Sequence, residues 1–99
     1  MDAQRLRLPD KIVAFQAGDP SALRGIVELL RGPLLRLAGR ILKDPITAED
    51  VFMECMARLI PLLADFEPAE SFAAYARRAV RNACVDEQRR RSSRDSRRA

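Results

Sequence analysis

The sequence contains no histidine and no tryptophan, and it has only two cysteines and four glycines. Histidine is the side chain that most often acts as a general acid or base near neutral pH. No glycine-rich phosphate loop follows a strand, and Cys55 and Cys84 each lack a second cysteine nearby that could complete a zinc motif. We therefore predict no catalytic residues, no metal and no other cofactor, and an enzyme is a remote alternative.

Long apolar runs are also missing. No segment reaches the roughly 20 apolar residues that cross a bilayer. The N-terminus carries Asp2, Arg5 and Arg7 where a signal peptide would have its apolar core. We therefore expect a cytoplasmic protein without membrane insertion. The two cysteines lie among apolar residues, so buried, reduced thiols are favoured over a redox switch.

Charge of both signs is present but unevenly distributed. Residues 1–76 hold nine basic and eleven acidic side chains, whereas residues 77–99 hold nine basic and three acidic ones. The last quarter of the chain therefore carries a net charge of +6. Arginine concentrated at one end of a chain indicates either a solvated surface or one that meets phosphate groups.

A length of 99 residues is sufficient for one domain with a single hydrophobic core. Alanine, leucine and arginine dominate the periodic segments, which favours an all-α fold, a small bundle of about four helices. We divide the chain into a flexible N-terminus over residues 1–9, a helical domain over residues 10–91, and a basic tail or start of an interdomain linker over residues 92–99.

Capping residues and prolines predict the first three helices. A short helix is expected over about residues 10–17, and a long one after Asp19 with a kink at Gly32-Pro33. Thr47 is predicted to cap the third helix, and Pro61 to cut or bend its last turn.

The fourth predicted helix combines two kinds of surface. It follows a loop over residues 65–70 and begins with Ser71 as its cap. Phe72 starts an apolar series at helical spacing and is expected in the core. Tyr75 and Asn82 lie among arginines, where an aromatic ring can stack on a base and an amide can bond to its edge. This interleaving favours nucleic-acid binding over a merely solvated arginine-rich end.

The third helix and the loop after it are acidic. Residues 44–70 contain seven acidic side chains and one basic side chain, Arg58. Glu49, Asp50 and Glu54 lie on neighbouring turns. Taken alone, these carboxylates are explained better by simple solvation than by a binding surface. The separation of acidic from basic segments shifts this balance towards a binding surface.

Four motifs in order give the chain a family resemblance. They are GDPSAL at residues 18–23, GPLLR at 32–36, AEDV at 48–51, and FAAYARRAVRN at 72–82 followed by DEQRRR at 86–91. In this order they resemble region two of a bacterial sigma factor of the extracytoplasmic-function group, over residues from about 12 to 91. The resemblance implies a helical module that binds the RNA polymerase core and opens promoter DNA without covalent chemistry.

The resemblance also implies which residues act. The acidic helix would pack on a coiled coil of the largest polymerase subunit through Glu49, Asp50, Glu54 and Arg58. The loop and last helix would hold the non-template strand of the minus-ten element, with one base flipped into a pocket. The residues implied for DNA are Phe66, Glu70 and Ser71 in the pocket loop, Tyr75, Arg78, Arg81, Asn82 and Asp86 along the strand, and Arg89 and Arg90 at backbone phosphates. An anti-sigma factor is a further partner that such a domain usually meets.

The chain departs from the family pattern at Met53, Pro61, Tyr75 and Arg77. The family usually has glutamine, an uninterrupted helix, tryptophan and an aromatic residue at these positions, so we expect altered core affinity or promoter preference. A helix-turn-helix that reads the minus-thirty-five element has no counterpart here, which corresponds to an excised domain or a free-standing region-two protein. Two alternatives stay open: a sigma-like regulatory or protein-interaction domain that has lost promoter melting, and a nonspecific nucleic-acid-binding helical bundle.

Overall fold

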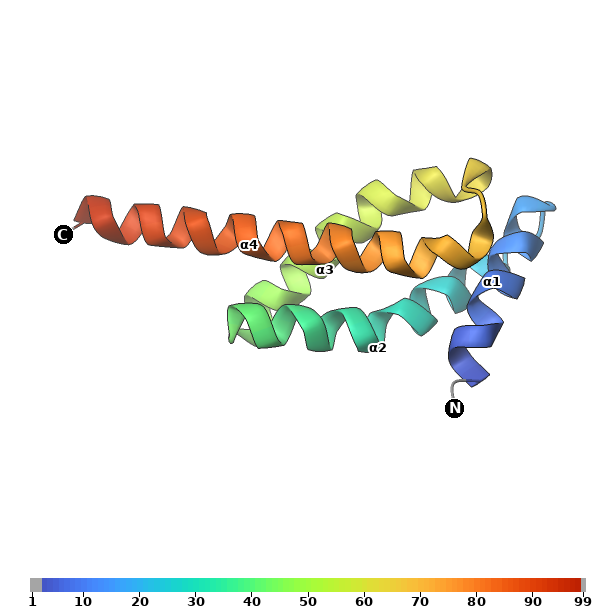
Figure 1. The fold of residues 1–99 in the computed structure, drawn as a ribbon, viewed down its shortest axis with the longest axis horizontal. Coiled ribbons are helices and arrows are strands. Elements are labelled where there is room, and N and C mark those ends of the chain that lie inside the picture. Colours follow the sequence, from blue (N-terminus) through green and yellow to red (C-terminus); the bar gives the residue numbers. More distant parts are fainter. Residues whose placement is uncertain (1–2, 99) are drawn as a thin grey trace.

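Four helices and two short 3-10 segments make up the described part of the chain (Figure 1). The structure is a computed structural model that describes the backbone of residues 3–98 and the side chains of residues 8–95. In chain order the elements are α1 (Ala3–Gln16), α2 (Ala22–Leu42), α3 (Pro45–Leu59), η1 (Ile60–Asp65), η2 (Ala69–Ser71) and α4 (Phe72–Arg98). The prediction of an all-α bundle of about four helices is confirmed.

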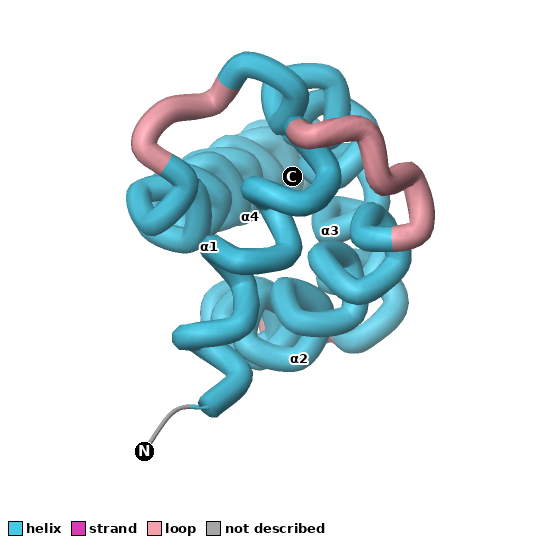
Figure 2. Tube along the Cα trace, turned by 90° about the vertical axis from the view of Figure 1, so that its right-hand side faces the viewer, coloured by secondary structure: helices cyan, strands magenta, loops and turns pink. Residues whose placement is uncertain are grey.

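Helices α2 and α4 run in the same direction, and α3 runs in the opposite direction (Figure 1). Seen along the long axis in Figure 2, α2, α3 and α4 form a triangle, and α1 lies across the end at which α2 begins. The C-terminal part of α4 projects past the other helices, so the molecule measures 53 × 28 × 20 Å. None of the helices between Ala3 and Arg98 combines the length and apolar character that a bilayer crossing requires.

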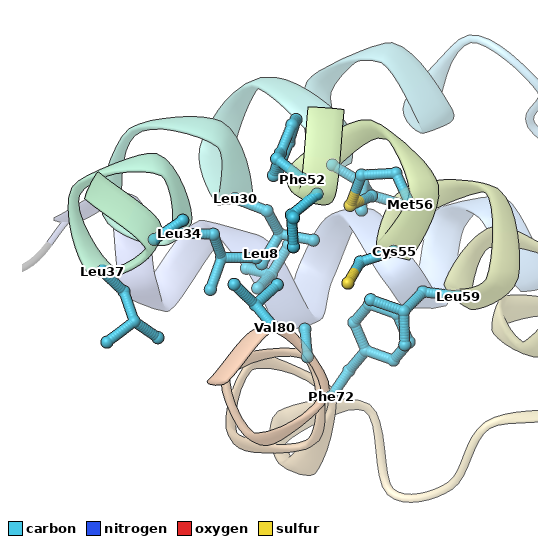
Figure 3. Close-up of a cluster of buried hydrophobic side chains, with 14 of the residues drawn as sticks. Leu8, Leu30, Leu34, Leu37, Phe52, Cys55, Met56, Leu59, Phe72 and Val80 are labelled. Atoms are coloured by element: carbon cyan, nitrogen blue, oxygen red, sulfur yellow. The ribbon is translucent and has the colours of Figure 1, made fainter. Parts of the chain in front are cut away.

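The hydrophobic core forms where the four helices meet. Figure 3 shows Phe72 reaching from α4 toward Cys55 and Leu59 of α3. The largest fully buried side chains come from all four helices and from η1: Phe52, Phe72, Ile12, Ile26, Leu63, Val80 and Cys84. One face of α4 is therefore anchored in the core, as its apolar spacing predicts.

Both cysteines are free thiols within this core. Burial raises the pKa of the Cys84 thiol to about 11 and also raises the pKa of Cys55, because a buried thiolate would lose its hydration. The two thiols therefore stay protonated near neutral pH, where they pack as small apolar groups.

Helix α1 begins earlier than the sequence indicates. We expected a flexible segment over residues 1–9 and a helix from about residue 10, whereas the helix runs from Ala3 to Gln16 with Pro9 inside it. Leu8 and Ile12 are four residues apart and both are buried. Packing of these two side chains on one face of α1 keeps the turn helical despite the proline. Residues 1 and 2 lie outside the described residues.

The start of α3 also differs from the prediction. Its cap is Asp44 and not Thr47: the Asp44 backbone is extended, and its carboxylate accepts a hydrogen bond from the backbone N–H of Ile46 at 3.1 Å. Pro45 then occupies the first helical position, where its missing N–H leaves no bond unmade. The C-terminal end of α3 agrees with the prediction: the α-helix stops at Leu59, and the 3-10 segment η1, with Pro61 as its second residue, follows.

Helix α4 is longer than expected. We expected regular structure to end near residue 91 and to be followed by a tail or linker, whereas the helix continues to Arg98. Glu87 lies 3.8 Å from Arg90, 3.5 Å from Arg91 and 3.8 Å from Arg94, measured between charged atoms. Pairs with this spacing, together with the good helix propensity of arginine, favour a continuing helix. Residue 99 lies outside the described residues.

Candidate nucleic-acid and protein interfaces

The outward side of α4 carries a line of polar side chains opposite its buried face. Its members follow one another at intervals of three or four residues, which places them on one side of an α-helix. We call these exposed residues the outer stripe: Tyr75, Arg78, Asn82, Asp86 and Arg89. The stripe contains an aromatic ring, an amide and two guanidinium groups, and Asp86 lies 3.9 Å from Arg89. Five of the ten residues predicted to bind DNA are thus brought together.

Arg81 and Arg90 lie off the outer stripe. They are nine residues apart, which at about 100° per residue places them roughly 180° apart around α4. Arg81 lies on the side that faces α2, the same side as Gln88, whose amide donates a hydrogen bond to the carbonyl oxygen of Ile41 at 2.8 Å. Arg90 instead pairs with Glu87. A single strand lying along the outer stripe does not meet both arginines on one face.

The pocket loop, residues 66–71, places aromatic side chains at the start of the outer stripe. The ring of the half-buried Phe66 meets that of Phe72 edge-on, with centroids 5.0 Å apart, and lies 5.3 Å from the ring of Tyr75. Phe72 is fully buried and Tyr75 is 40% exposed, so Phe66 connects the core with the surface. Glu70 and Ser71 are exposed beside it.

Gln16 at the end of α1 holds this loop, a contact that the sequence did not reveal. Its side-chain amide donates hydrogen bonds to the carbonyl oxygens of Leu63, at 2.9 Å, and Phe66, at 2.8 Å. The partners are about 50 residues away in the sequence, and neither periodicity nor a motif marks the position.

The acidic helix α3 presents a mixed outer side. Asp50, Glu54 and Arg58 are exposed there. Two large apolar side chains, Ile46 at 76% exposure and Met53 at 55%, share this side with Asp50 at helical spacing. The sequence could have indicated their exposure, because neither residue falls on the apolar spacing that marks the buried side of α3.

Glu49 differs from the other acidic residues of α3 because it already has a partner. Both of its carboxylate oxygens accept hydrogen bonds from Arg31 of α2, each at 2.9 Å. The same guanidinium lies over the ring of Phe52, 5.7 Å from its centroid. Glu49 therefore connects α3 to α2, and its carboxylate is less available to another molecule than that of Asp50.

Arg91, the last arginine of the DEQRRR motif, bridges α4 to the start of α3. It donates to the carboxylate of Asp44 at 3.0 Å and also to the hydroxyl of Thr47. Thr47 in turn donates to Asp44 at 2.7 Å. These contacts lower the pKa of Asp44, chiefly through the Thr47 hydroxyl and then through Arg91, against an opposing effect of desolvation. Arg91 is thus a structural residue within an otherwise exposed arginine run.

Acidification is expected to weaken this bridge. Because the pKa of Asp44 in the folded protein lies below its ordinary value of 3.8, its contribution to stability is complete above that value and is lost as the pH falls through the lower, folded-state pKa. Lowering the pH from about 5 to about 3 should therefore reduce the free energy of unfolding more in the wild type than in Asp44→Asn. Urea unfolding at the two pH values measures this, and equal losses in both proteins would contradict the assignment.

Comparison with known families gives a match. A family model described as sigma-70 region 2 matches residues 26–94. The match covers most of α2, all of α3, the pocket loop and α4 as far as Arg94. Comparisons with curated proteins and with solved structures gave no significant match. Sigma region 2 is a non-enzymatic domain of transcription initiation that serves in RNA polymerase binding and promoter recognition. Since the match spans well over half of the sequence, the chain belongs to the sigma-70 region 2 family.

Proposed function

We propose that this domain opens promoter DNA by holding the non-template strand of the minus-ten element on the outer stripe and the pocket loop. The observation that carries the proposal is the alignment of Tyr75, Arg78 and Asn82 on one exposed side of a helix whose opposite side is fully buried. An interface anchored in this way does not have to be ordered when DNA arrives, so less conformational entropy is lost on binding.

The energetics of strand separation suit these side chains. Removing a base from the duplex stack costs a few kcal/mol. Stacking of a base on an aromatic ring contributes about 1–3 kcal/mol per base. The rings of Tyr75 and Phe66 are in contact at the point where the pocket loop meets the outer stripe. Asn82 can donate to and accept from a base edge, while Arg78 and Arg89 can hold phosphates. Ser71 and Glu70 border the same site from the loop.

We further propose that the outer side of α3 binds the polymerase core, on the coiled coil of its largest subunit. Asp50, Glu54 and Arg58 supply charge, and the exposed Ile46 and Met53 supply apolar area beside Asp50. Glu49 does not contact the core directly in this proposal. It connects α3 to α2 through its hydrogen bonds with Arg31. The domain would then work in the cytoplasm with polymerase, and an anti-sigma factor that covers either surface would block the corresponding contact.

Binding of a single-stranded minus-ten oligonucleotide tests the DNA proposal. We expect the 99-residue chain to bind it more tightly than a scrambled strand of equal composition, with affinity that falls as salt rises. Fluorescence anisotropy at several salt concentrations measures both effects. Equal affinity for the two strands would indicate a nonspecific nucleic-acid-binding bundle. Binding to polymerase core without any binding to the oligonucleotide would indicate a sigma-like interaction domain that has lost melting.

A further inference from the structure

The pocket loop is held by α1, a helix that the family match over residues 26–94 does not include. Helix α1 packs against η1, which leads into the loop, and against η2, which ends it. Figure 1 shows α1 at the same end of the molecule as the start of α4, where the outer stripe begins. The position of the pocket loop therefore depends on an element outside the matched region.

The end of α1 is a fixed point from which Gln16 reaches the loop. Gln16 is the last residue of the helix, and Ile12, one turn earlier, is fully buried in the core. Gly18 has a φ of 108°, a left-handed conformation that favours glycine. The backbone N–H groups of Gly18 and Asp19 donate to carbonyl oxygens of the last turns of α1. Gln16 thus extends from a capped and anchored helix end.

The Gln16 amide spans the turn that leads into the pocket loop. Its nitrogen donates to the carbonyl oxygens of both Leu63 and Phe66. The backbone N–H of Phe66 also donates to Leu63, but at 3.4 Å, which is long for such a bond. Leu63 is fully buried, whereas Phe66 is half-buried. Gln16 therefore ties the first residue of the loop to the core across a turn that its own backbone closes weakly.

The backbone of Phe66 determines where its ring lies. That ring contacts both Phe72 and Tyr75. The next two residues, Glu67 and Pro68, are exposed, so burial does little to order this part of the loop. A loop that is already ordered loses less conformational entropy when a ligand enters it. The two bonds of Gln16 are therefore suited to preparing the site for a base.

We propose that Gln16 is a positioning residue for base capture. It keeps the pocket loop in the conformation that receives the flipped base, and it acts through Phe66 without touching DNA. The inference rests on the proposed DNA function and adds α1 to the elements that serve it. The effect of Gln16 should be confined to the base in the pocket, and contacts with phosphates should not depend on it.

Binding of Gln16→Met to minus-ten oligonucleotides tests this role. Methionine has a similar length but no donor. Because such a hydrogen bond typically contributes a factor of about 2 to 12, we expect Gln16→Met to bind the intact strand roughly 3- to 10-fold more weakly than the wild type. A series of strands that each lack one base identifies the captured base in the wild type. The strand without that base should bind both proteins equally, as measured by fluorescence anisotropy.

Gln88→Met is the matched control. Gln88 is also an exposed glutamine whose amide donates to a backbone carbonyl of another helix, that of Ile41 at 2.8 Å. Ile41 lies in the last turn of α2, whereas α1 lies across the end at which α2 begins. Both variants should lose similar stability in urea unfolding. Gln88→Met should nevertheless distinguish the intact strand from the abasic strand as well as the wild type does.

The fluorescence of Tyr75 provides a measurement without DNA. The chain contains one tyrosine and no tryptophan, so its intrinsic fluorescence comes from Tyr75. If Gln16→Met releases Phe66, the Tyr75 ring becomes more accessible. Quenching by acrylamide should therefore increase in Gln16→Met and remain at the wild-type level in Gln88→Met.

The outcomes separate this inference from the proposed function. Equal binding of minus-ten and scrambled strands by the wild type would refute the proposed function, and the role in base capture with it. If the wild type is selective but Gln16→Met keeps the wild-type ratio of intact to abasic binding, only the role of Gln16 is refuted. An equal loss for both strands, or the same change in Gln88→Met, would show general destabilisation. Weaker binding with unchanged quenching would show direct contact with DNA. Either result overturns the proposal.

Discussion

Replacing Phe72 by alanine should destabilise the domain by about 3–5 kcal/mol, whereas Tyr75→Ala should lower its stability by only about 1 kcal/mol. Phe72 is fully buried and fills the space between α4 and α3, so its removal leaves a cavity. Tyr75 is 40% exposed and loses mainly its contact with Phe66. Urea unfolding measures both values. Similar losses in the two variants would show that α4 is not divided into a core face and a free face.

The same pair of positions separates folding from recognition. We expect Tyr75→Ala to weaken binding of the minus-ten oligonucleotide by about 10- to 100-fold, because one stacked base contributes about 1–3 kcal/mol. Tyr75→Trp restores the aromatic residue that the family usually has, and it should bind at least as tightly as the wild type. If Tyr75→Ala binds normally while remaining folded, no base stacks on this ring.

Reversing one charge on α3 should have the second large effect. Asp50→Arg is expected to reduce affinity for the polymerase core by on the order of 100-fold, because it places the wrong charge at the centre of the proposed interface. Binding of the minus-ten oligonucleotide should not change, since α3 and the outer stripe are separate surfaces. Pull-down and titration with purified core enzyme measure the effect.

The control for Asp50→Arg is Glu28→Arg, which reverses an exposed acidic residue of α2. It should bind the core normally. Core binding by Asp50→Arg at the wild-type level would exclude the outer side of α3 as the contact. Glu49→Gln provides a second comparison, because its carboxylate is bonded to Arg31. We expect Glu49→Gln to lower the stability of the domain more than its affinity for the polymerase core. This result would distinguish Glu49, which connects α3 to α2, from Asp50, which is proposed to contact the core.

Much of the candidate DNA site could be predicted because helical phase is a local property. The spacing of Phe72, Val80 and Cys84 identifies the buried side of α4, and the polar side chains opposite then form the outer stripe. The same reasoning could have separated Arg81 from Arg90, since nine residues turn a helix by about two and a half turns. Motif order added the family, which the match over residues 26–94 confirms.

The sequence by itself determined the all-α class, the inner and outer sides of α3 and α4, and the sigma-70 region 2 family. Only the tertiary structure decided that Gln16 holds the pocket loop and that Arg91 bridges to Asp44. The reason is the range of the interactions. Periodicity and capping act within a few residues, whereas these contacts join groups more than 40 residues apart, and packing of the helices alone brings them together.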